Sequence, residues 1–126
     1  MKLTSRDAAP AHSAHYPDSP VVTVLSGTGS SPDVGMVRVT VPAGAGMPAH
    51  KHGGSDVILT PASGSVRVVK GDETIEVAVG DALLILKDEA VALSNPYQET
   101  AELIVAAGPS TFVAAVEAWP EVSTRV

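Results

Sequence analysis

The chain has 126 residues, of which 44% are hydrophobic and 17% charged, and it contains no cysteine. This composition is typical of one folded domain, and the lack of cysteine excludes disulfides, thiolate metal sites and iron–sulfur clusters. The net charge of −6, from 14 acidic and 8 basic residues, disfavours binding to nucleic acid or to an anionic membrane.

The first twenty residues are expected to form an N-terminal arm outside the core. Pro10, Pro17 and Pro20 interrupt any regular pattern there. The segment has no apolar stretch of the kind that a secretory signal needs, and the longest apolar run, Leu103 to Ala107, is too short to cross a bilayer. We therefore expect a cytoplasmic protein with neither nucleic acid nor membrane as a partner.

Short strands separated by turns are expected from residue 21 onward. Val37, Val39 and Val41 alternate with polar residues, a pattern typical of strands with one buried face. In chain order, the expected strands are 21–25, 37–41, 56–60, 66–69, 74–79, 83–86, 91–93 and 103–107. Loop composition marks the segments between them, including 42–48 and 61–64. Turns at this spacing predict an all-β sandwich or barrel over residues 21–109.

One short helix is expected after the strands, in residues 110–126. Ser110 is a suitable N-cap, Phe112, Val116 and Trp119 fall on one helical face, and Pro120 ends the pattern. No long helical pattern precedes residue 109, which argues against an α/β architecture.

His50 and His52 are the strongest candidates for a functional site. Residues i and i+2 of a strand point to the same face, so the two imidazoles can converge on one ion. Asp56 follows four residues later and can supply a carboxylate. Two histidines and one carboxylate form a three-ligand site with open positions for a substrate.

Several alternatives stay open for this site. The third ligand can instead be Glu89, or His12 or His15 from the arm, although histidines in a proline-rich arm are more often solvated. Asp56 is equally well interpreted as a surface carboxylate before a strand. The histidine pair can also form hydrogen bonds in a pocket that holds no metal.

The spacing of these residues resembles the two motifs of the cupin family. The matching positions are Gly44, His50, His52, Gly64, Gly80 and Asn95. The resemblance covers roughly residues 35–107. It implies an antiparallel β-barrel of the cupin type, a jelly roll or double-stranded β-helix, with a metal ion held inside. It also implies a homodimer, because the family commonly dimerises through sheet edges and terminal arms.

The sequence departs from the cupin motifs at several positions. Leu86 and Asp88 replace a proline and a glycine of the second motif, and Val91 replaces its metal-binding histidine. The glutamate of the first motif falls on Asp56 when counted from the second histidine, and on Val57 when counted back from the closing glycine. Two ligands of the family site are therefore matched, one is ambiguous and one is missing.

Two functions follow from the resemblance and its departures. The first is a small metal-dependent enzyme of the dioxygenase, isomerase or cyclase type, with iron, zinc, manganese or nickel held by His50, His52 and Asp56 for a small organic substrate. The second is a non-catalytic cupin with a degenerate metal site that binds or senses a small molecule. Val91 favours this alternative, because it makes the pocket more apolar where a ligand is lost.

Overall fold

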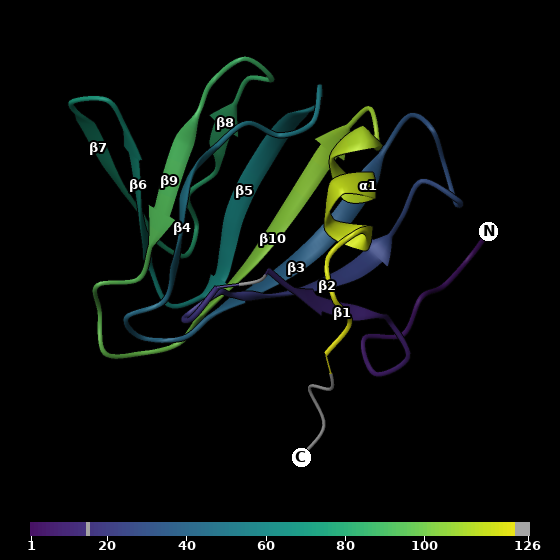
Figure 1. The fold of residues 1–126 in the computed structure, drawn as a ribbon, viewed down its shortest axis with the longest axis horizontal. Helices are drawn as coiled ribbons and strands as arrows, with labels where there is room; N and C mark the ends of the chain where they lie inside the picture. Colours follow the sequence, from purple (N-terminus) through teal and green to yellow (C-terminus); the bar gives the residue numbers. More distant parts are fainter. Residues whose placement is uncertain (15, 123–126) are drawn as a thin grey trace.

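The computed structural model describes residues 1–14 and 16–122, which form two antiparallel sheets facing each other as the walls of a barrel (Figure 1). The larger sheet contains, in spatial order, β1 (Ala11–Ser13), β2 (Val21–Ser26), β3 (Gly35–Val41), β10 (Ala101–Gly108), β5 (Asp56–Ser63) and β8 (Leu83–Ile85). The smaller sheet contains β4 (Gly46–His50), β9 (Val91–Ser94), β6 (Val66–Lys70) and β7 (Glu73–Val77). The helix α1 (Thr111–Glu117) follows β10.

Alternating valines build the core, as the sequence predicts. On β3, Val37, Val39 and Val41 are buried, and the first two pair in register with Val105 and Leu103 of β10. The same alternation buries every second residue of β5 and β10. Branched aliphatic side chains pack well on a pleated surface, so a core with few aromatic residues can hold the two sheets together. The all-β fold with a short C-terminal helix is confirmed.

Two segments with the composition of loops, 42–48 and 61–64, are partly strand in the structure. Residues 46–50 form β4, where a Cβ atom on Gly46 would collide with the carbonyl oxygen of Leu93 on β9. Glycine therefore permits the close approach of these two strands. In β5 the strand continues through Pro61, which is a register partner of Leu103, and the chain turns only at Gly64. Gly64 has a φ of +71° and packs against the backbone at Ala101, which explains a glycine at this motif position.

The N-terminal segment differs from the expected arm. Residues 11–13 form β1, which pairs with β2, and Ala11 and His12 are buried. The Nδ1 atom of His12 lies 2.9 Å from the carbonyl oxygen of Trp119, and the backbone N–H of Val122 donates to Ala11 at 2.9 Å. This part of the chain is therefore held by β2 on one side and by the C-terminal segment on the other.

The helix α1 lies against β2, β3 and β10 and covers part of the barrel (Figure 1). Phe112, Val116 and Trp119 all turn toward the barrel interior, which confirms the predicted apolar face. Ser110 occupies the N-cap position, but its side chain makes no capping hydrogen bond. The hydroxyl of Ser55 accepts the bond from the N–H of Phe112 instead, at 2.9 Å. In the described residues, no helix has the length and apolar character that a membrane span requires.

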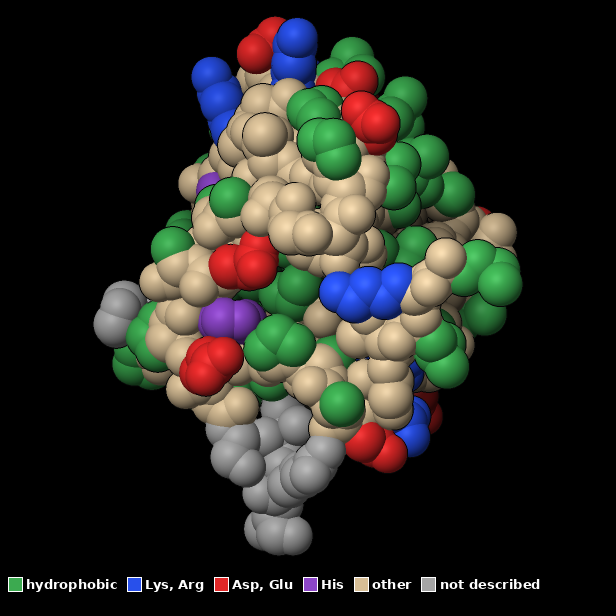
Figure 2. Space-filling view, turned by 90° about the vertical axis from the view of Figure 1, so that its right-hand side faces the viewer, with side chains coloured by type: hydrophobic (Ala, Val, Ile, Leu, Met, Phe, Trp, Pro, Cys, Tyr) green, Lys and Arg blue, Asp and Glu red, His purple; other side chains and the backbone are tan. Residues whose placement is uncertain are grey.

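Some hydrophobic side chains lie on the outside of the larger sheet. Met36, Ile58 and Leu84 are exposed and line a shallow groove there. Figure 2 shows hydrophobic side chains gathered mainly along one side of the molecule. The strands β5 and β8 thus carry apolar residues on both faces.

Candidate functional site

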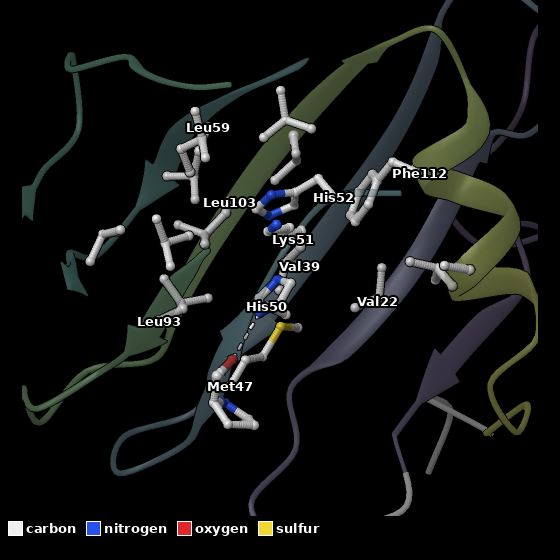
Figure 3. Close-up of a pocket in the computed structure, with 18 of the residues that line it drawn as sticks. Val22, Val39, Met47, His50, Lys51, His52, Leu59, Leu93, Leu103 and Phe112 are labelled. Carbon is white, nitrogen blue, oxygen red and sulfur yellow. Dashed lines mark hydrogen bonds between the residues drawn. The ribbon is translucent and has the colours of Figure 1, made fainter. Parts of the chain in front are cut away.

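A cavity of about 230 Å³ lies between the two sheets and is bounded on one side by α1 (Figure 3). Its wall is almost entirely apolar. The aliphatic residues that line it include Val22, Val39, Val57, Leu59, Val68, Ile85, Val91, Leu93, Leu103 and Val105. Aromatic residues at its edge are Tyr16, Phe112 and Trp119. A cavity of this kind is suited to hold the apolar part of a small molecule.

His50 and His52 both line this cavity. His50 is the last residue of β4, and His52 lies two residues further on, ahead of a turn at Gly53 and Gly54. The centroids of their rings are 4.7 Å apart, and the ring planes are inclined at 58°. Figure 3 shows the two imidazoles along the same wall. The structure therefore brings together the pair that the sequence singles out.

The two histidines have different surroundings. The Nδ1 atom of His50 lies 2.9 Å from the carbonyl oxygen of Pro48, at an exposed position. His52 is only 6% exposed, and its Nδ1 atom is buried without a hydrogen-bond partner among the described residues. Phe112 packs beside it, with ring centroids 5.3 Å apart. A buried nitrogen without a partner is costly in a folded protein, so this atom is a natural contact point for a ligand.

Burial, and to a smaller extent the neighbouring charge of His50, together lower the pKa of His52 from its ordinary value of 6.5 to about 4. Removal from water disfavours the imidazolium form, and a second positive charge 4.7 Å away does the same. His52 is therefore neutral at pH 7, where it offers one N–H donor and one nitrogen acceptor.

Asp56 is not brought to the histidine pair. It is exposed at the start of β5, and its Oδ1 atom accepts a hydrogen bond from the N–H of Lys87 at 2.8 Å. Its neighbour Val57 points into the cavity and is 1% exposed. Because side chains alternate along a strand, only one of these two residues can face inward. The glutamate position of the motif is thus Val57, and the surface interpretation of Asp56 agrees with the structure.

The other candidate ligands also lie elsewhere. Glu89 accepts hydrogen bonds from the Nζ atom of Lys70 at 2.8 Å and from the N–H of Leu86 at 2.9 Å. His12 is buried, which differs from the solvated position that its arm suggests, and it contacts the carbonyl oxygen of Trp119. His15 lies outside the described residues.

The donors at this site do not fit a metal ion. The four family ligand positions hold His50, His52, Val57 and Val91, and Val91 is the register partner of His50 on β9. Zinc sites use three or four protein donors, and an aliphatic side chain supplies none. Nowhere in residues 1–14 and 16–122 do three or more histidine, aspartate or glutamate side chains gather as a metal site would require.

Ser55 and Tyr16 shape the site but gave no signal in the sequence. The hydroxyl of the fully buried Ser55 donates to the carbonyl oxygen of Pro109 at 2.6 Å and accepts from the N–H of Phe112. These two bonds join the segment that follows His52 to the start of α1. Tyr16 donates to the carbonyl oxygen of Gly46 at 3.3 Å, beside the cavity. Their partners are distant in the chain, so no local pattern identifies them.

The Cupin domain family model matches residues 37–107 of this chain. Among curated proteins, no match is found. Solved structures with the same fold include the polyketide cyclase RemF from Streptomyces resistomycificus, which is 21% identical with a TM-score of 0.73, over 86% of this chain and 79% of that one.

Two further solved structures extend the comparison. KdgF from Halomonas sp. is 18% identical with a TM-score of 0.71, over 86% of this chain and 94% of that one. A predicted oxalate decarboxylase from Thermotoga maritima is 16% identical with a TM-score of 0.73, over 86% of this chain and 99% of that one. At these identities the likeness concerns the double-stranded β-helix fold.

Proposed function

Because the chain belongs to the cupin family, whose domain model matches residues 37–107, we propose that it uses the cupin barrel to bind a small, largely apolar molecule without a metal ion. The observation that carries this proposal is the pair of valines at two of the four ligand positions. Val57 and Val91 are 1% and 5% exposed and line the cavity beside the histidines. They leave the cavity apolar, with the two histidines as polar groups in its lining.

Binding of a small molecule in this cavity would combine burial of apolar surface with one hydrogen bond. The aliphatic wall favours a hydrocarbon or aromatic body, since burial of apolar surface contributes about 25 cal/mol per Å². His52 lines the cavity, and its Nδ1 atom, which has no hydrogen-bond partner among the described residues, would provide the polar contact. An engineered cavity of about 150 Å³ holds benzene. A cavity of about 230 Å³ therefore suits one substituted ring or a chain of similar size.

The metal-dependent enzyme that the family resemblance implies is less well supported. Its third ligand was expected from Asp56, which faces away from the cavity. Proton transfer by His52 is also poorly supported, because a pKa of about 4 makes this imidazole a weak base at neutral pH. A binding or sensing role requires neither a third ligand nor a strong base.

The proposal is tested by a thermal-shift screen of small apolar and aromatic compounds in the presence of a chelator. A ligand at one hundred times its Kd stabilises the folded state by about 2.7 kcal/mol, so several compounds are expected to raise Tm. The variant Val105→Phe fills the cavity and is expected to abolish the shifts. Val34→Phe is the matched control, because Val34 is exposed outside the cavity. Shifts that appear only with added metal would contradict the proposal.

A further inference from the structure

We propose that the ligand is a small carboxylic acid, whose carboxylate lies between Lys51 and His52 at the rim while its apolar body enters the barrel. This inference rests on the proposed function and adds the chemical class of the ligand. It follows from the distribution of charge around the cavity and from His52, a lining residue whose Nδ1 atom has no hydrogen-bond partner among the described residues.

The charge at the cavity is opposite in sign to that of the whole chain. The protein carries 14 acidic residues, yet none of them is among the residues that line the cavity. Lys51 does line it and is exposed to solvent, which places an ammonium group at the rim. A cavity edged by one positive charge and lined by no carboxylate favours an anionic group on the ligand.

Lys51 also forms no ion pair with any residue that the structure describes. Lys70, Arg38 and Arg67 each form an ion pair with a glutamate. No carboxylate in the described residues lies within ion-pair distance of Lys51. Its ammonium group is therefore available to a ligand.

The histidine pair supplies the second contact. His52 lines the cavity, and its Nδ1 atom has no hydrogen-bond partner among the described residues. In the tautomer that carries its proton on Nδ1, this imidazole would donate to an oxygen of the ligand. Figure 3 shows Lys51 and His52 close together on the wall that also carries His50. A carboxylate has two acceptor oxygens, so one can face the lysine and the other the imidazole. An amide of the same shape satisfies the hydrogen bond but not the charge.

The test compares acids with neutral amides of the same size in a fluorescence titration. Trp119 is the single tryptophan of the chain and lines the cavity, so its emission reports occupancy. The probes are phenylacetate, benzoate and hexanoate, each paired with its primary amide. Lys51→Met removes the charge at similar length, and Lys87→Met is the matched control, because Lys87 is an exposed lysine that does not line the cavity.

We expect the wild type to bind at least one acid about tenfold more tightly than its amide, in line with the strength of charge-assisted hydrogen bonds. Lys51→Met should lose this preference while its affinity for the amide stays the same, and Lys87→Met should keep it. Equal affinity for acid and amide in the wild type, or a preference that survives in Lys51→Met, would overturn the inference and leave apolar binding intact. If no acid and no amide binds, the inference also falls, and the thermal-shift screen decides separately on the proposed function.

Discussion

His50 and Val91 are register partners across the antiparallel pair of β4 and β9. In the cupin motifs, these two positions belong to two metal-binding histidines, one from each motif. The strand pairing that would bring two imidazoles together instead sets an imidazole against an isopropyl group. The barrel keeps the arrangement of a cupin site, and an aliphatic side chain stands where the motif has one of its metal ligands.

Restoring the two missing donors should restore metal binding. In the variant Val57→Glu/Val91→His, the four family ligand positions would again carry three histidines and one carboxylate. We expect this variant to bind about one Zn²⁺ or Ni²⁺ per chain, measured by elemental analysis after dialysis, and to gain Tm with the metal. Without metal it should be less stable than the wild type, because burying an unpaired carboxylate is costly.

Asp56→Ala serves as the matched control for metal binding in the wild type. Because Asp56 faces solvent and contacts the N–H of Lys87, its removal should leave the metal content unchanged. A wild type that retains a stoichiometric ion and loses it in His50→Ala/His52→Ala would contradict the metal-free proposal. Loss of the ion in Asp56→Ala would contradict the assignment of Val57 to the glutamate position.

The low pKa of His52 predicts a loss of stability in mild acid. In the unfolded chain this imidazole takes up a proton near pH 6.5, but in the folded state it does so only near pH 4. Between these values the unfolded state binds more protons than the folded state, so the free energy of unfolding falls as the pH falls from 6.5 to 4. Above pH 6.5 the imidazole is neutral in both states, and this loss of stability does not occur. Each pKa unit corresponds to about 1.4 kcal/mol, which gives a loss of about 3 kcal/mol.

Urea unfolding of the wild type and of His52→Gln between pH 7.5 and 4 measures this contribution. The glutamine variant cannot titrate at this position, so its stability should depend less on pH in the same range. An identical pH dependence in both proteins would show that the buried imidazole is not the group responsible.

Ser55→Ala should destabilise the protein and loosen the contact between His52 and Phe112. The hydroxyl of Ser55 accepts from the N–H of Phe112 and donates to the carbonyl of Pro109. Its loss leaves two backbone groups unpaired, at a cost of about 2 kcal/mol. Chemical denaturation measures the change, and Ser110→Ala is the control, because the side chain of Ser110 makes no capping bond. A larger effect at Ser110 than at Ser55 would contradict the assignment of the cap.

His12→Ala tests whether β1 holds the C-terminal segment in place. His12 is buried and contacts the carbonyl oxygen of Trp119, whereas the similar contact of His50 with Pro48 is exposed. We expect His12→Ala to lower the free energy of unfolding by about 1–3 kcal/mol and His50→Ala to change it by much less. Equal stability of the two variants would indicate that residues 11–13 are not part of the folded core.

The strands were predictable because their signal is local. Alternation of valines with polar residues identifies β3 without knowledge of its neighbours, and the apolar face of α1 follows from the spacing of Phe112, Val116 and Trp119. The strand β4 carries no such alternation, because its residues include Gly46 and Pro48, which are typical of loops. Gly46 is required by the backbone of β9, which lies more than 45 residues away in the chain.

The site was only partly predictable for the same reason. The spacing of His50 and His52 places both imidazoles on one wall. Motif counting allows Asp56 or Val57 at the glutamate position, and the sequence predicts Asp56 as the ligand. Only the observed alternation along β5 decides between them. The contacts of Ser55 and His12 join residues more than 50 positions apart, so no pattern within the sequence identifies them.

The central claim is that the barrel binds its ligand without a metal ion. It is tested most directly by calorimetric titration with the tightest compound of the screen, before and after the protein is stripped with a chelator. We expect one site per chain with the same Kd in both preparations, and no binding to Val105→Phe. Binding that disappears on stripping and returns with added Zn²⁺ or Fe²⁺ would contradict this account.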